Sequence, residues 1–290
     1  MPTLVFDGIA YGMLLFVLAL GLAVTMGLMN FINLAHGAFA MAGGYLLIVL
    51  MQRWGWPFLA CLPAAFAATA LAGALLERTL YRPMYARPHL DQVLFSIGLT
   101  YMAIASVSWL VGPQPQNVQL PGFLLHRFEL GQGGWQLGMS AYRLLIVGLC
   151  LVLALALQAV LTRTRFGSRL RAAVDDPRVA AGLGIPVDRV FLATFAVGSG
   201  LAGLGGALGA DVMGMDPSFP LKVMVYVLIV CAVGGTAGLT GPMVAALVLG
   251  IADVMGKYYL PKLGAFIVYV LMIAILLWRP QGLFTRESAR

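Results

Sequence analysis

Residues 8–52 read GIAYGMLLFVLALGLAVTMGLMNFINLAHGAFAMAGGYLLIVLMQ and contain no Asp, Glu, Lys or Arg. A membrane-spanning helix needs about 20 consecutive apolar residues, so this stretch is long enough for two spans with almost no loop between them. Polar side chains near its middle indicate a turn or an interrupted helix. The stretch therefore predicts an all-α polytopic membrane protein with a broken or re-entrant helix near residues 30–37.

The rest of the chain repeats this pattern of apolar runs between short charged segments. Further spans are predicted at residues 54–76, 93–111, 144–161, 190–210 and 263–278. Residues 223–252 are too long for one span and are interrupted by Gly and Pro, which predicts two short helices or a re-entrant hairpin, broken near residues 234–242. We expect about nine transmembrane helices, with roughly eight to ten allowed, in a single transmembrane domain covering residues 1–290.

Composition excludes several other classes of protein. Apolar residues make up 61% of the chain, charged residues 10%, and the mean hydropathy is +0.93, whereas a soluble domain has roughly 25% charged residues. The sequence has no P-loop, HExxH, GxSxG or CxxC pattern, so nucleotide hydrolysis, zinc proteolysis and thiol redox chemistry are not predicted. We expect no metal site and no catalytic residue, and the three cysteines lie in apolar runs as packing residues.

The net charge of +7 comes from basic residues in short loops, which indicates membrane orientation and not nucleic-acid binding. The larger group of arginines lies around residues 78–87, 163–189 and 279–290, and such loops stay in the cytoplasm. This predicts a cytoplasmic C-terminus and, with nine spans, an N-terminus on the outer face of the membrane. Residues 112–140 would form an outer loop and residues 162–189 a cytoplasmic loop. The N-terminal run lacks a basic region and a cleavage site, so we expect a retained span.

The interruption GLMNFINLAHGAFAMAGGY, residues 27–45, holds the first candidate pathway residues. They are Asn30, Asn33, His36, Gly37 and Gly43. Polar side chains at membrane depth are costly unless they face protein or a water-filled path, and the three polar residues would share one face if the helix were continuous. They could line a translocation pathway. Equally, they could form a turn or a helix–helix hydrogen bond, with the glycines permitting close packing.

A second interruption, VGGTAGLTGP, covers residues 233–242. Paired broken helices in the two halves of a chain are typical of a transporter's pathway, which makes Gly234 and Gly235 candidate pathway residues. Asp253 is a further candidate because it is an acid inside an apolar segment, but it could equally pair with Lys257. The many glycines of the run 190–210 indicate close packing against a neighbouring helix.

The cytoplasmic loop contains TRTRFGSRLRAAVDDPRVAAGLGIP at residues 162–186. Asp176 suits a helix N-cap and Pro177 the first helical position. Gly184 suits the residue just past a helix end, so a short surface helix is predicted from Pro177 to Leu183. Its exposed face is expected to carry Val179, Ala180, Ala181 and Leu183. This helix could enter a partner's groove or lie on an anionic bilayer beside the arginines.

Four motifs carry a resemblance to a known family. They are GLMNFINLAHGAFAMAGGY (27–45), RAAVDDPRVAAGLGI (171–185), VGGTAGLTGP (233–242) and RPQGLF (279–284). Together they resemble the permease subunits of ATP-binding-cassette (ABC) importers for branched-chain amino acids, of the LivH type, over nearly the whole chain. The resemblance implies pairing with a second homologous permease subunit in the lipid bilayer, two cytoplasmic ATPase subunits, and a periplasmic solute-binding protein.

The same resemblance implies that the surface helix is a coupling helix seated in an ATPase cleft. The residues expected to act in ATPase coupling are Arg171, Asp175, Asp176, Pro177, Arg178, Ala180, Leu183 and Gly184. ATP would be bound by the partner subunits, so this chain is expected to need no cofactor and to be no enzyme. Closure of the ATPases would displace the helix and rock the spans, which alternates access to the pathway.

The apolar runs have no Lys or Arg away from their ends. This favours a solute that is neutral overall, such as a zwitterionic amino acid with an aliphatic side chain. Alternative solutes are urea, short amides and small carboxylates. An alternative class is an ion-coupled secondary transporter using Asp253 and His36, which would take up solute without ATP. An intramembrane hydrolase is disfavoured because no Ser or Cys lies in a recognisable catalytic context.

Overall fold

The computed structural model describes residues 1–29, 33–85, 87–130, 137–235 and 238–284, and most of them are helical. The α-helices are α1 (Pro2–Met29), α2 (His36–Trp54), α3 (Phe58–Leu76), α4 (His89–Leu110), α5 (Ala141–Arg163), α6 (Arg165–Asp175), α7 (Pro177–Gly182), α8 (Val187–Met213), α9 (Phe219–Gly234), α10 (Thr240–Tyr259) and α11 (Gly264–Trp278). The shorter elements are the π-helix η1 (Glu77–Tyr81), the 3₁₀ helices η2 (Arg82–Met84) and η3 (Gly122–Leu124), and the strands β1 (Arg127–Leu130) and β2 (Leu137–Ser140).

The chain is a polytopic, mostly helical membrane protein. Within the described residues, six helical segments are long and apolar enough to cross a membrane: Pro2–Thr25, Phe58–Met84, His89–Leu110, Ala141–Arg163, Val187–Met213 and Thr240–Tyr259. Two apolar helices, Phe219–Gly234 and Phe266–Trp278, are shorter. Each apolar run predicted from the sequence contains a helix, and each of the two longest runs contains two.

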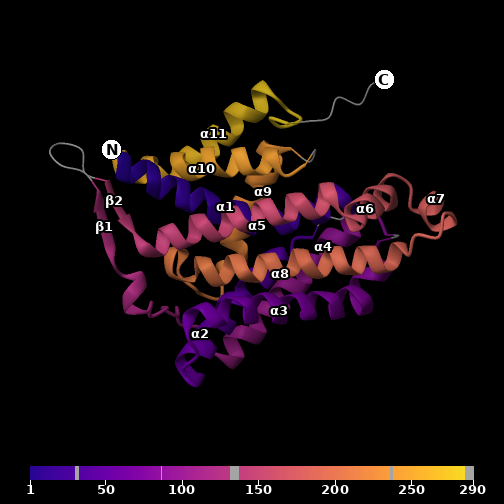
Figure 1. Cartoon of the computed structure of the whole chain (residues 1–290), viewed down its shortest axis with the longest axis horizontal. Coiled ribbons are helices and arrows are strands. Elements are labelled where there is room, and N and C mark those ends of the chain that lie inside the picture. The colour runs from indigo at the N-terminus through magenta and orange to yellow at the C-terminus, as the bar shows by residue number, and fades with distance from the viewer. Residues whose placement is uncertain (30–32, 86, 131–136, 236–237, 285–290) are drawn as a thin grey trace.

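Helix α8 lies at the centre of the bundle, where it packs against α1, α2 and α3 (Figure 1). Its glycines allow this close approach. A Cβ atom on Gly203 would lie 2.2 Å from the hydroxyl oxygen of Thr69 in α3, and one on Gly206 would lie 1.8 Å from the carbonyl oxygen of Ala40 in α2. Small-residue contacts of this kind are what hold helices together in lipid. The structure thus confirms the packing role predicted for the glycines of this run.

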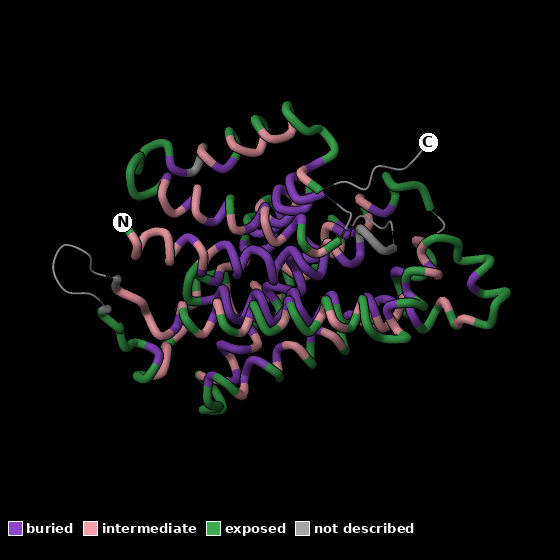
Figure 2. The backbone as a smooth tube through the Cα atoms, turned by 45° about the horizontal axis from the view of Figure 1, so that its top comes forward, coloured by how far each residue is buried: buried purple, intermediate pink, exposed green. Residues whose placement is uncertain are grey.

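The helices around this centre differ in how much of their surface is buried. The middle of the bundle is buried, and the outer helices alternate between exposed and half-buried residues (Figure 2). Trp109 of α4 and Leu277 of α11 are 85% and 80% exposed. Such large apolar surfaces suit contact with lipid or with another membrane subunit.

Both predicted interruptions separate helices. Helix α1 ends at Met29 and α2 begins at His36, in agreement with the break predicted near residues 30–37, so Asn33 and His36 do not share one continuous helix. Asn30 lies outside the described residues. At the second interruption α9 ends at Gly234 and α10 begins at Thr240. The structure therefore has two helices at this position, the first of the two alternatives.

The segment 112–140 departs from an all-α fold because β1 and β2 pair as an antiparallel hairpin. Strands of four residues are too short for their alternation to be recognised in a sequence. The backbone NH of Gly138 donates to the hydroxyl of Thr3 (3.1 Å), and that of Gln116 donates to the carbonyl of Met215 (2.8 Å). The segment thus lies at the N-terminal end of the bundle, and α6 and α7 lie at the opposite end (Figure 1).

Candidate functional site

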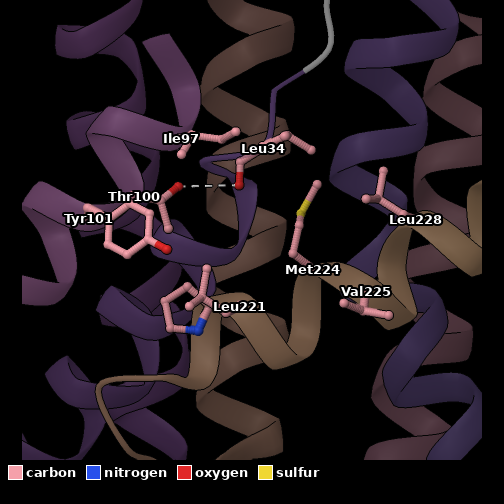
Figure 3. A pocket seen from close by; sticks show the side chains of 9 residues that line it. Leu34, Ile97, Thr100, Tyr101, Leu221, Met224, Val225 and Leu228 are labelled. Atoms are coloured by element: carbon pink, nitrogen blue, oxygen red, sulfur yellow. Dashed lines mark hydrogen bonds between the residues drawn. The ribbon is translucent and has the colours of Figure 1, made fainter. Parts of the chain in front are cut away.

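A groove of about 180 Å³ lies beside the first interruption, between α4 and α9 (Figure 3). Its lining residues are Leu34, Ile97, Thr100, Tyr101, Pro220, Leu221, Met224, Val225 and Leu228. None of these described side chains carries a charge, and most are aliphatic. The volume suits a small solute better than a large ligand, and the groove offers an uncharged, almost wholly apolar surface.

Side chains from two other elements hold the segment between α1 and α2 in place. The side-chain oxygen of Asn33 accepts hydrogen bonds from the backbone NH of Ala35 and from the hydroxyl of Tyr81, both at 3.0 Å. Leu34 donates its NH to the hydroxyl of Ser96 (3.1 Å), and its carbonyl accepts from Thr100 (3.4 Å), which is the dashed line in Figure 3. Protein partners of this kind are what allow irregular backbone at membrane depth.

His36 and the glycines of α2 pack against neighbouring helices. The imidazole Nε2 of His36 lies 2.9 Å from the carbonyl oxygen of Leu18, and because a carbonyl only accepts, Nε2 donates. A Cβ atom on Gly37 would lie 2.6 Å from the carbonyl oxygen of Pro220, and one on Gly43 would lie 2.1 Å from that of Gly203. These candidate pathway residues, like Asn33, are not part of the groove lining.

The residues that follow α11 pack against the second interruption. The NH of Leu283 donates to the carbonyl of Val233 (2.8 Å). Gly235 has a φ of +81°, and a Cβ atom there would lie 2.7 Å from the carbonyl oxygen of Phe284. The motifs VGGTAGLTGP and RPQGLF therefore meet in space. Gly234 and Gly235 lie at the C-terminal end of α9, about 21 Å along the helix from Pro220.

Asp253 lies away from the groove, in α10. It is 1% exposed, and its Oδ2 lies 2.6 Å from the ammonium nitrogen of Lys257, one helical turn later. That nitrogen also lies 5.7 Å from the centre of the Tyr11 ring in α1, which is a cation–π distance. The pairing with Lys257 that the sequence left open is thus the arrangement in the structure.

The surface helix α7 forms largely as its capping residues predict. The carboxylate of Asp176 accepts hydrogen bonds from the backbone NH groups of Arg178 (2.9 Å) and Val179 (3.0 Å), and Gly184 has a φ of +81°. Val179 and Leu183 are 58% and 77% exposed. They give this end of the bundle an apolar projection among arginines.

One expectation for α7 is wrong, because Ala180 is only 2% exposed. Helix α7 packs on α6 and α8, and Ala180 lies on the packed face. The other predicted coupling residues are exposed: Arg171, Asp175, Asp176, Pro177, Arg178, Leu183 and Gly184. Among them, Arg171 donates from its guanidinium to the carbonyl of Leu161, which ties α6 to the end of α5.

Sequence reasoning missed two groups of residues around the groove. The first is the aliphatic lining, such as Leu34 and Met224. The sequence does not distinguish an apolar residue that faces a groove from one that faces lipid. The second is the pair Glu77 and Tyr81, which are 3% and 0% exposed. Polar residues four apart on one helix face, at Glu77, Tyr81 and Tyr85, are a signal that could have identified the second group.

Among the described residues, no group of three or more His, Cys, Asp and Glu side chains could hold a metal ion. The helical bundle, the uncharged groove at a broken helix and the capped surface helix are the features of a multi-pass membrane permease subunit. A family model described as "Branched-chain amino acid transport system / permease component" matches residues 4–276, and the chain belongs to this family. It is the permease component of a branched-chain amino acid ABC transport system, a transport subunit and not an enzyme, and no cofactor is expected for it.

Named relatives match the chain over nearly its full length. The permease protein LivH of the high-affinity branched-chain amino acid transport system of Escherichia coli K12 is 26% identical and is matched over 98% of this chain and 95% of its own. BraD of Pseudomonas aeruginosa PAO1 is 25% identical, over 97% and 95%. LivM of Escherichia coli K12 is 27% identical, over 93% and 68%. No solved structure matches the chain.

Proposed function

We propose that the groove beside Leu34 is one half of an ATP-driven import pathway for aliphatic amino acids, completed by a second homologous permease subunit. The observation that carries this proposal is the uncharged lining at a broken helix. Much of the lining is open to the outside of the chain: Tyr101 is 56% and Leu221 is 43% exposed. LivH and LivM of one organism are both named as permease proteins of a branched-chain amino acid transport system, which supports a pair of related subunits.

In this proposal, solute selection depends on contact with aliphatic side chains. Each buried methylene group contributes about 0.8 kcal/mol, so leucine gains over smaller amino acids where Met224 and Leu228 meet its side chain. A charged solute would lose hydration without a partner. The candidate pathway residues Asn33, His36 and Gly37 would help to hold the chain beside this surface, and Asn30 would belong to the same interruption. Gly43, Gly234, Gly235 and Asp253 are not part of the lining and would fix helix packing elsewhere along the proposed pathway.

We propose a bacterial inner-membrane topology of about nine spans. They correspond to α1, α2, α3 with η1, α4, α5, α8, α9, α10 and α11. The arginines of the segment 162–189 support a cytoplasmic position for α6 and α7. The opposite end, with residues 112–140 and the N-terminus, would then be periplasmic and would receive the solute-binding protein, and the C-terminus would be cytoplasmic.

The segment 162–189 is the proposed docking site for the ATPase subunits. Val179 and Leu183 would enter an ATPase cleft, and Arg171, Asp175 and Arg178 would make charge-assisted hydrogen bonds around it. Asp176, Pro177 and Gly184 would fix the helix ends, and Ala180 would support α7 from its buried side. ATP can shift the permease between states only if the ATPases bind this segment differently in each state.

Filling the groove tests the pathway. In the complex reconstituted with its partner subunits, Met224→Trp is expected to abolish leucine uptake while ATPase stimulation by the solute-binding protein persists. Val270→Trp, at a 64% exposed position of α11, is the matched control. Equal uptake by the two variants would reject the groove as the pathway. Competition by urea, acetamide or benzoate, and not by isoleucine, would assign the alternative solutes.

A further inference from the structure

The apolar helix α3 continues beyond Leu76 as a turn of π-helix, η1. Single π turns are rare and are frequent at functional sites. Its first residue, Glu77, is 3% exposed, and its carboxylate accepts a hydrogen bond from the hydroxyl of Tyr85 (3.1 Å). A buried acid on an irregular turn is costly unless the surrounding contacts keep it there.

Two contacts join this region to the start of α8, which directly follows the segment with α6 and α7. Arg82 pairs with Asp188, and the ring of Tyr85 packs edge-on against Phe191, with centroids 6.2 Å apart. The side chains of the ion pair are 51% and 68% exposed. Exposed pairs contribute little to folding stability, so this pair can be exchanged without loss of the fold.

Tyr81, at the other end of η1, reaches the groove segment. Its ring lies between α8 and α4, with centroids 4.6 Å from Phe195 and 5.2 Å from Phe95. Its hydroxyl donates to Asn33, whose same oxygen accepts from the NH of Ala35. Leu34, between these two residues, lines the groove. One continuous set of contacts therefore runs from Asp188 to the groove.

We infer that Tyr81 is a positioning residue that transmits movement of the α6–α7 segment to residues 33–35 beside the groove, an inference that rests on the proposed function. When the start of α8 moves, Arg82 and Tyr85 move η1 with it. The Tyr81 hydroxyl then carries Asn33 and with it Leu34. Without that hydroxyl, the ATPases still act on α7, but the groove segment follows their motion less closely.

The test compares two buried tyrosines in the reconstituted complex. Tyr81→Phe keeps the ring packing and leaves Asn33 its bond from Ala35. Tyr142→Phe is the matched control, because this tyrosine is 3% exposed and donates one hydrogen bond, to the carbonyl of Leu208 (2.6 Å), far from α7. Tyr81→Phe is expected to lower the solute imported per ATP hydrolysed by about 2- to 30-fold. The control is expected to leave this ratio unchanged.

A second readout follows the groove segment directly. The thiol introduced by Leu34→Cys is labelled with a maleimide in the nucleotide-free and the vanadate-trapped complex; the native Cys61, Cys150 and Cys231 are buried. A nucleotide-dependent labelling rate is expected with Tyr142→Phe, and a smaller dependence on nucleotide is expected with Tyr81→Phe. The charge exchange Arg82→Asp with Asp188→Arg is expected to restore the import ratio that each single change lowers.

Each outcome decides the inference. Equal import ratios for the two tyrosine variants, a nucleotide dependence of labelling that is equal in the two variants, or a charge exchange that restores nothing would each overturn it. A wild-type complex without ATP-driven uptake is a different result. It would reject the proposed function, and the inference with it, before any variant is compared.

Discussion

Replacing Gly206 by Ala is expected to separate α8 from α2. A Cβ atom at this position would lie 1.8 Å from the carbonyl oxygen of Ala40 and 2.5 Å from its carbonyl carbon, and these are backbone atoms that cannot rotate away. Because real Cβ contacts essentially never fall below 3.0 Å, the two backbones must move apart by at least 1.2 Å, the difference between 1.8 Å and 3.0 Å.

A gap of only about 0.5–1 Å already removes a quarter to a half of the dispersion attraction of a contact. Overpacking typically lowers the free energy of unfolding by about 1–3 kcal/mol. The higher helix propensity of alanine raises it by about 1 kcal/mol. The contact at Gly206 is backbone against backbone, so the cost lies at the upper end of this range. We expect a net loss of about 1–2 kcal/mol in the free energy of unfolding.

The assay is thermal unfolding of the purified chain in detergent, followed by tryptophan fluorescence. Gly148→Ala in α5 is the matched control, because no atom lies within 4 Å of a Cβ atom there. This control gains helix propensity without a clash, so its melting temperature is expected to be unchanged or higher, and that of Gly206→Ala lower. Equal melting temperatures for the two variants would refute the packing argument for α8.

Three further predictions follow from local contacts. Asp176→Ala removes the cap of α7, which costs about 1 kcal/mol, and is expected to weaken ATPase stimulation in the complex. Asp175→Ala is the control, because Asp175 is a neighbouring exposed acid without a cap bond, and its effect is expected to be smaller. Equal stimulation in the two variants would contradict the role of the cap. Burial raises the pKa of Asp216, but the ammonium of Lys222 and the hydroxyl and NH of Ser218 outweigh this and hold the pKa below its usual value. Asp216 therefore stabilises the fold above pH about 4, and this stabilisation is lost as the pH falls through the lowered pKa. The melting temperatures of wild type and Asp216→Asn should converge below that pH. A difference that stays constant with pH would count against a stabilising ion pair between Asp216 and Lys222. Lys257→Met leaves the buried carboxylate of Asp253 without its partner and is expected to lower the melting temperature more than Asp253→Asn does. The double variant is expected to recover part of this loss. Additive effects of the two substitutions would argue against coupling of the two side chains.

The sequence alone predicts those features that depend on local chemistry. Helix α7 follows from Asp176 and Pro177, which act within one turn of the chain. The interruption after Met29 follows from an uncharged run too long for one span. The packing role of the α8 glycines follows from their number, since few other arrangements explain so many glycines in one apolar helix.

The groove depends on which helices become neighbours, and a single sequence does not specify this. Met224 of α9 and Ile97 of α4 are apolar residues like those that face lipid, and only the bundle places them beside Leu34. His36 and Asp253 are candidate pathway residues because they are polar residues in apolar runs, yet both have partners inside the protein. Glu77 follows the end of a predicted span, whereas the helix continues past it as η1, and its carboxylate accepts a hydrogen bond from the hydroxyl of Tyr85.

The central claim is that this chain forms a pathway whose movement is supplied by separate ATPase subunits. The most direct measurement is uptake of radiolabelled leucine into proteoliposomes that contain either this chain alone or the chain with its partner permease, ATPases and solute-binding protein. If this claim holds, the complete complex accumulates leucine in an ATP-dependent manner and the chain alone accumulates none. Accumulation by the chain alone, driven by an ion gradient and unaffected by ATP, would contradict it.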